Sequence, residues 1–131
     1  MLYVRYSPPA AVDISGGLLA LRQLHAALLG FLQGADLAFQ IALATGYDPA
    51  PYDLALHQLR LIKSSELIDV HVDLADRALL ISGRPDYLDA FAAYVEPPAD
   101  TWPGYHVHFE YYEEHPIIAP GALPLVICVQ S

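Results

Sequence analysis

Apolar residues recur along the chain at helical spacing in two places, and the two places predict two helices. The first helix is predicted over residues 17–32, with Ser15 as a plausible N-cap and Gly34 at its end. The second is predicted over residues 85–95, where Pro85 suits the first turn and Pro97-Pro98 follows the last. Every three or four positions a large apolar residue marks the buried stripe, at Leu21, Leu24, Leu28 and Phe31 in the first helix and at Leu88, Phe91, Ala92 and Val95 in the second.

Shorter apolar runs flank both helices and predict strands. The predicted strands cover residues 2–6, 11–14, 37–45 and 54–62 in the first half, and residues 67–73, 78–81, 105–112 and 125–129 in the second. Each half therefore reads as two strands, one helix and two more strands.

One tripeptide occurs twice in equivalent places. Ile14-Ser15-Gly16 returns as Ile81-Ser82-Gly83, sixty-seven positions later, and the same offset aligns Ser64 with Ser131. An offset that preserves element order predicts an internal duplication of a β-β-α-β-β unit, with residues 1–64 and 65–131 as pseudo-repeats within one domain of residues 1–131. Two such units side by side indicate an α+β fold, in which an antiparallel sheet packs against two helices.

Composition indicates a chain that is folded throughout. Of its 131 residues, 55% are hydrophobic and 16% are charged, the opposite of a disordered composition. The one cysteine, Cys128, lies in an apolar run and has no partner for an internal disulfide. The N-terminal residues 1–10 lack the pattern of a signal peptide, so we expect a cytoplasmic protein.

Charge is distributed unevenly between the halves. The net charge is −9, yet residues 1–64 hold four acids and four Lys or Arg residues, which cancel. Residues 65–131 hold eleven acids against Arg77 and Arg84. A field of this sign repels nucleic acids and anionic membranes and attracts basic partners. We therefore expect neither a nucleic acid nor a membrane as partner.

Two predicted strands alternate strictly between apolar and polar residues. In the later strand, His106, His108 and Glu110 point away from the apolar face; in the earlier one, Asp69, His71 and Asp73 do so. If the strands were neighbours, three imidazoles and three carboxylates would gather, a set that suits zinc or another first-row metal. The same alternation is typical of the solvent-facing side of a half-buried antiparallel sheet. Both interpretations remain open at this point.

Sequence motifs of enzymes are missing from the chain. It has no nucleophile elbow, no P-loop and no dinucleotide-binding glycine motif. Ser15-Gly16-Gly17 precedes the first predicted helix, where amides could hold an anion, although helix capping explains the same residues. We expect a protein that is not an enzyme and that has no cofactor.

Three stretches of the second half resemble a known family. They are Ala78-Leu79-Leu80-Ile81-Ser82-Gly83, Gly104-Tyr105-His106-Val107-His108-Phe109-Glu110-Tyr111-Tyr112 and Ala119-Pro120-Gly121-Ala122-Leu123-Pro124-Leu125-Val126-Ile127. Together they resemble the immunity proteins of bacterial polymorphic toxin systems, and the immunity protein 32 family most of all. The resemblance implies a small cytoplasmic protein that binds a cognate toxin domain and blocks it.

The resemblance and the charge asymmetry lead to one functional hypothesis. We expect an immunity protein whose acidic face captures a basic toxin. The residues expected to bind the partner are the polar ones of the two alternating strands and of the loop after the second, namely Asp69, His71, Asp73, His106, His108, Glu110, Glu113 and Glu114. One alternative is a metal-dependent enzyme or metal-binding protein that uses His106, His108 and Glu110. A generic protein-binding module is the other.

Overall fold

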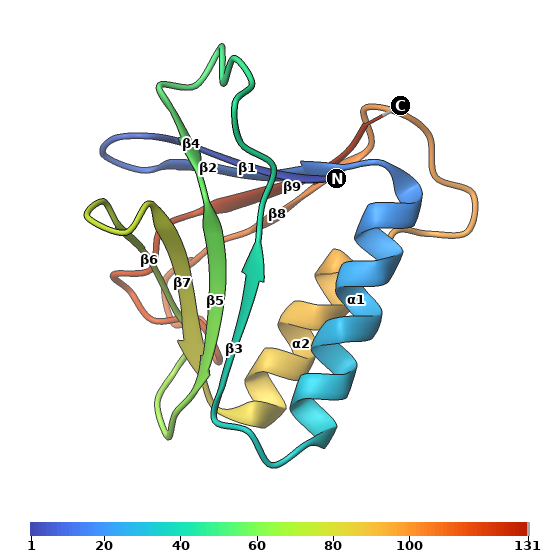
Figure 1. The fold of residues 1–131 in the computed structure, drawn as a ribbon. Coiled ribbons are helices and arrows are strands. Elements are labelled where there is room, and N and C mark those ends of the chain that lie inside the picture. Colours follow the sequence, from blue (N-terminus) through green and yellow to red (C-terminus); the bar gives the residue numbers. More distant parts are fainter. Residues whose placement is uncertain (131) are drawn as a thin grey trace.

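A computed structural model describes residues 1–130, which form two helices and nine strands (Figure 1). Ser131, the predicted counterpart of Ser64, lies outside the described residues. The elements are, in chain order, β1 (Leu2–Ser7), β2 (Ala11–Gly16), α1 (Leu18–Gln33), β3 (Ala38–Ala42), β4 (Leu54–Leu56), β5 (Gln58–Lys63), β6 (Asp69–Asp73), β7 (Ala78–Gly83), α2 (Pro85–Val95), β8 (His106–Phe109) and β9 (Leu125–Val129).

The strands form two mixed sheets, with the orders β4-β1-β2-β9-β8 and β3-β5-β7-β6. The α+β class with two helices is confirmed, but the expectation of a purely antiparallel sheet is wrong. At the centre of each sheet, one antiparallel strand pair of the first half meets one of the second half, and the two strands that meet run parallel. The outer pairs are antiparallel.

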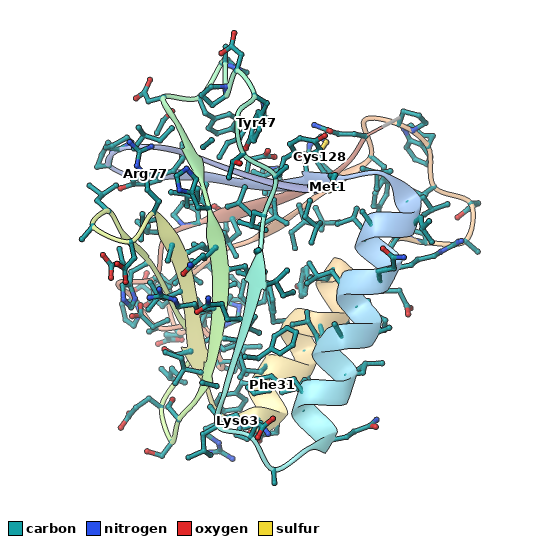
Figure 2. The ribbon with its side chains drawn as sticks, in the orientation of Figure 1. Met1, Phe31, Tyr47, Lys63, Arg77 and Cys128 are labelled. Atoms are coloured by element: carbon teal, nitrogen blue, oxygen red, sulfur yellow. The ribbon has the colours of Figure 1, made fainter. Side chains whose placement is uncertain are left out.

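The two helices lie side by side and pack on the strands from one side (Figure 1). Both predicted stripes are buried, and they join inward residues of both sheets in one hydrophobic core. At the end of α1, Lys63 Nζ of β5 lies 4.6 Å from the centre of the Phe31 ring and donates a hydrogen bond to the carbonyl of Gly34 (Figure 2). Phe31 also stacks on Phe39 of β3.

The ends of α1 agree with the sequence in part. Gly34 caps the C-terminal end, and its N–H donates to the carbonyls of Gly30 and Phe31. The prediction of Ser15 as N-cap is wrong: Gly17 takes that place, and no side chain caps the helix. The reason is that β2 continues to Gly16, so that Ser15 is a fully buried strand residue.

Three predicted strands have clearly different bounds from those expected, and the run 37–45 shortens to β3. The run 54–62 divides at His57, because β4 pairs with β1 in one sheet whereas β5 pairs with β7 in the other. The run 105–112 shortens to β8, so that Glu110 follows the strand. In the second half, residues 117–123 correspond to β4: they run along the outer edge of β6, where Leu123 N–H donates to the carbonyl of Val70.

Element positions match between the halves at the predicted offset. Ala11 and Ala78 begin β2 and β7, while Gln58 and Leu125 begin β5 and β9, each pair sixty-seven residues apart. The directions of the paired strands also correspond. Along β1-β2-β9-β8 in one sheet and along β6-β7-β5-β3 in the other, the successive pairs are antiparallel, parallel and antiparallel. The duplication as the origin of this similarity stays a prediction.

The repeated Ile-Ser-Gly tripeptide has a packing explanation. Ile14 and Ile81 are fully buried. A Cβ atom on Gly83 would lie 2.9 Å from Cγ1 and 3.1 Å from Cα of Ile68, and one on Gly16 would lie 3.2 Å from the backbone oxygen of Met1. At both sites a glycine permits close approach of another segment of the chain.

Replacing Gly83 tests the packing explanation. Gly83→Ala should lower the free energy of unfolding by about 1–3 kcal/mol, because the backbone of Ile68 cannot move away as a flexible side chain could. Gly30→Ala is the control: no atom lies within 4 Å of its added Cβ, and alanine in a helix should raise stability by up to about 1 kcal/mol. Urea unfolding measures both values. Equal stability of the two variants would contradict the explanation.

Candidate functional site

The strand β8 presents its side chains as the sequence predicted. His106 and His108 are exposed, whereas Val107 is half-buried and Phe109 is buried. Glu110 is exposed directly after the strand. The predicted alternation is confirmed, and the two imidazoles lie on the outer face of the five-stranded sheet.

The other alternating strand, β6, lies in the other sheet. Val70 is buried and His71 is exposed, with Asp69 and Asp73 half-buried beside it. The Nδ1 atom of His71 is 3.1 Å from Oδ2 of Asp69. Because β6 ends one sheet and β8 ends the other, the two strands do not pair, and the six polar residues do not form one cluster.

The geometry around His106 and His108 does not form a metal-binding set. Their ring centres are 5.4 Å apart, and Nδ1 of His106 donates to the carbonyl of Gly104. Within residues 1–130, no group of three or more His, Cys, Asp or Glu side chains is placed to hold a metal ion. Of the two interpretations of this strand, the solvent-facing one agrees with the positions of the side chains.

An ordered loop carries the other predicted acids. Glu113 and Glu114 are exposed in this loop after β8, and Glu114 has a positive φ of 63°. His115 holds the following turn, because its Nδ1 accepts hydrogen bonds from the N–H groups of Ile117 and Ile118. Since residues 117–123 run along β6, this loop leads from the end of β8 to the edge of β6.

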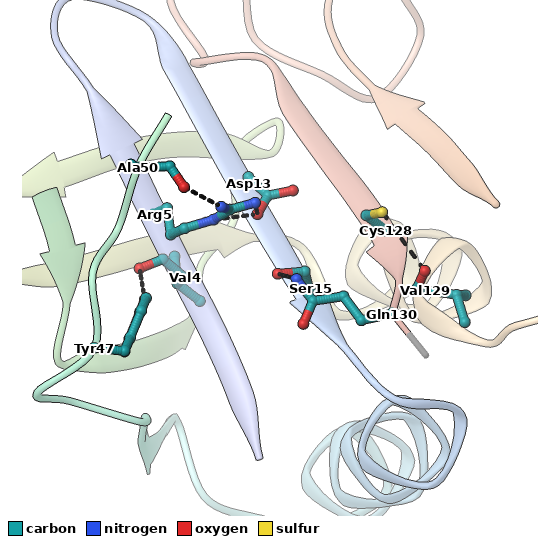
Figure 3. Close-up of polar contacts among 9 residues, drawn as sticks. All are labelled: Val4, Arg5, Asp13, Ser15, Tyr47, Ala50, Cys128, Val129 and Gln130. Carbon is teal, nitrogen blue, oxygen red and sulfur yellow. Dashed lines mark hydrogen bonds and ion pairs between the residues drawn. The ribbon is translucent and has the colours of Figure 1, made fainter. Parts of the chain in front are cut away.

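A buried ion pair lies on the outer face of the same sheet (Figure 3). Asp13 of β2 has a side chain that is 3% exposed, and its Oδ2 accepts hydrogen bonds from Nε and Nη2 of Arg5 at 3.0 and 2.8 Å. Nη1 of Arg5 donates to the carbonyl of Ala50, and its guanidinium lies over the ring of Tyr52. We did not single out this pair from the sequence, although an aspartate within the apolar run of β2 signals a buried partner.

Ser15 lies on the same face and has a structural role. Its Oγ is 3.2 Å from Nε2 of Gln130, which donates to it (Figure 3). The anion-binding interpretation of Ser15-Gly16-Gly17 is therefore not supported, since Ser15 is fully buried and occupied.

A histidine without a predicted role joins the two helices. Nδ1 of His25 on α1 is 2.9 Å from the carbonyl of Ala92 on α2, and Nε2 is 2.8 Å from Oε2 of Glu96. These contacts hold the Glu96 side chain at the C-terminal end of α2. The sequence offered no signal for them, because His25 stands alone on the polar side of its helix.

Cys128 is a half-buried residue of β9. This strand lies between β8 and β2, the strand that carries Asp13 and Ser15. Burial raises the pKa of the Cys128 thiol, and the negative charge of Asp13 raises it further. Its sulfur contacts the carbonyl of Val129 at 3.7 Å. Such a thiol is mostly protonated at neutral pH and is a poor nucleophile.

The reactivity of Cys128 tests this environment. At pH 8 the folded protein should react with iodoacetamide at least about tenfold more slowly than the same chain in urea, because a raised pKa leaves less thiolate and burial restricts access. As pH rises, the rate for the folded chain should increase at higher pH than the rate for the unfolded chain. Cys128→Ser provides the blank. Superimposable rate profiles of folded and unfolded chains would contradict the description.

Comparison with known proteins adds a family to this geometry. The family model of immunity protein 32 matches residues 78–130, which begin at the first residue of β7 and include α2, β8 and β9. No curated protein and no solved structure gives a significant match to the chain. None of the helices within residues 1–130 is long and apolar enough to cross a membrane. The resemblance is confirmed: residues 78–130 carry the sequence pattern of the immunity protein 32 family.

Proposed function

We propose that this protein is an immunity protein that binds a cognate toxin domain and blocks it through the acidic surface of its second half. One observation carries the proposal. The segment that matches the immunity protein family, residues 78–130, contains no Lys or Arg after Arg84.

The exposure of the acids in this segment supports the proposal. All seven are exposed, at Asp86, Asp89, Glu96, Asp100, Glu110, Glu113 and Glu114. Asp86 pairs with Arg84, and Glu96 pairs with His25. The other five form no salt bridge within residues 1–130. Exposed acids without internal partners accelerate the capture of a basic protein.

A basic toxin fits this surface chemically. A toxin that acts on nucleic acids needs positive charge in its cleft, and an acidic protein can occupy such a cleft. Asp69, His71 and Asp73 on β6 lie at the far end of the loop that begins at Glu110, so they can extend the same surface.

The two alternatives make different demands on the molecule. A metal-dependent enzyme needs converging ligands in a concave site, and the described part of the chain does not bring His106, His108 and Glu110 together in that way. A generic protein-binding module could use the same surface with another partner. The functional experiment therefore has to identify the partner.

Co-expression with the toxin domain encoded beside this chain's gene is that experiment. Cells that produce the toxin should survive when this protein is present and die when it is absent. Survival that does not depend on this protein, or death in its presence at matched expression, would reject the immunity function and leave the generic binding module.

Charge reversal tests the acidic surface itself. The triple variant Glu110→Lys, Glu113→Lys and Glu114→Lys should associate with the toxin about 10-fold to 100-fold more slowly at low salt, with a smaller difference at high salt. The control reverses three exposed acids of the first half, Asp36, Asp48 and Asp53, and changes the net charge by the same amount. Stopped-flow association kinetics distinguish a local effect from a general one. Equal slowing by both triple variants would contradict an acidic binding face in the second half.

A further inference from the structure

An apolar groove lies between the C-terminal end of α2 and β8. Its volume is about 330 Å³. The lining side chains are mainly apolar and come from α2, the segment after it, β8, β9 and α1; they include Tyr94, Pro97, Tyr105, Val107, Ile127 and Leu21. Tyr94 is 45% exposed, and Trp102, whose ring meets that of Tyr105 edge to face, is 59% exposed. Exposed aromatic residues beside an apolar groove are the side chains that most often anchor a protein partner.

The groove runs beside an unpaired strand edge. β8 is the last strand of its sheet and pairs with β9 alone among the described strands. Val129 N–H donates to the carbonyl of Tyr105, so this carbonyl faces β9 and the N–H of His106 across the same peptide bond points away from it. Bonding groups alternate along an antiparallel strand, and those of His106 and His108 therefore point away from β9 to the free edge.

A glycine turn fixes the start of this edge. Tyr105 N–H donates to the carbonyl of Trp102, which closes a turn with Pro103 and Gly104 at its centre. Gly104 has a φ of 91°, and both its N–H and the carbonyl of Tyr105 bond to Val129, as in a bulge with glycine at its first position. The turn brings the ring of Trp102 against that of Tyr105, directly before β8.

The first half has a similar groove with different surroundings. It lies between α1 and β3, has a volume of about 320 Å³ and includes Leu24, Phe39 and Ile41 in its lining. β3 is also the last strand of its sheet. However, acids and basic residues balance in residues 1–64, whereas residues 85–131 contain acids and no Lys or Arg. Only the second groove therefore combines an unpaired edge with a surface that attracts basic groups.

We propose that an extended segment of the toxin adds as a strand to the free edge of β8 and places alternate side chains in the α2–β8 groove. In such a strand, successive side chains point to opposite faces. Those on the groove side would meet Tyr94, Tyr105 and Val107, which favours apolar residues. Those on the other side would lie beside His106, His108 and Glu110 within the acidic surface, which favours Lys or Arg. The inference rests on the proposed function and adds the position and the binding mode.

Proline substitution at the edge tests the backbone part of the proposal. His108→Pro removes an N–H that points away from β9, a position where an edge strand tolerates proline. His108→Ala removes the imidazole and keeps the N–H. The proline variant should bind the purified toxin domain at least about tenfold more weakly than the alanine variant, as measured by calorimetric titration of the full chain. Circular dichroism and thermal melting check that both variants are folded.

Removal of an aromatic side chain tests the groove without changing the backbone. Trp102→Ala should weaken toxin binding at least about tenfold, mainly through faster dissociation. Leu37→Ala is the control, because Leu37 is 71% exposed and lies before β3 in the first half of the chain. The control should bind within about twofold of the parent. If His108→Pro does not fold, the comparison of Trp102→Ala with its control still tests the proposal.

The outcomes separate the two proposals. Weaker binding by His108→Pro than by His108→Ala, together with weaker binding by Trp102→Ala than by its control, supports strand addition at β8. If the parent neutralises the toxin and these two variants bind as tightly as their controls, strand addition at β8 is wrong and the immunity function stands. If the parent protein neither binds nor neutralises the toxin, both proposals are wrong.

Discussion

Two parallel strand pairs hold the halves of this protein together. β2 pairs with β9, and β5 pairs with β7, so that each sheet joins an antiparallel strand pair of the first half to one of the second, and β4 extends the five-stranded sheet. In both sheets the inner strand of each antiparallel pair has its other partner in the other half. The helices of the two halves also pack on each other, and buried residues of both halves form one core.

The outer strand edges differ in what lies beside them. β4 covers the edge of β1, and residues 117–123 cover the edge of β6. The three-residue strand β4 and β8 end the five-stranded sheet, β3 ends the other opposite β6, and β3 and β8 each lie beside a groove against a helix. An unpaired edge invites pairing with another chain. On β8 this edge lies in the acidic segment that matches the immunity protein family, which is why we place the toxin there.

Local patterns of the sequence predicted the elements well. The stripes of both helices, the end of α1 at Gly34 and the exposure of His106 and His108 follow from spacing within a few residues. The pairing of strands could not be predicted in this way, because the parallel contact of β2 with β9 joins residues more than a hundred positions apart. The hypothesis that β6 and β8 are neighbours depended on such a pairing, and the structure places them in different sheets.

Some residues of the candidate site could be predicted from the sequence, and others could not. Acidic excess and strand alternation are visible in the sequence, and they identified Glu110, Glu113 and Glu114 as exposed. The α2–β8 groove was not predicted, because it arises where side chains of five elements and segments meet. Trp102 belongs to no periodic element, so its place beside the groove became visible only in the structure.

Amide hydrogen exchange of this protein, alone and in complex with its toxin domain, tests the account most directly. We expect slower exchange in the complex at His106 and His108, whose N–H groups face the open edge of β8, together with residues 110–115 of the acidic loop. Exchange at β3, which has the corresponding edge in the first half, should stay unchanged. Protection confined to β3 and α1, with unchanged exchange along β8 and the acidic loop, would contradict the assignment of the toxin-binding surface to the second half.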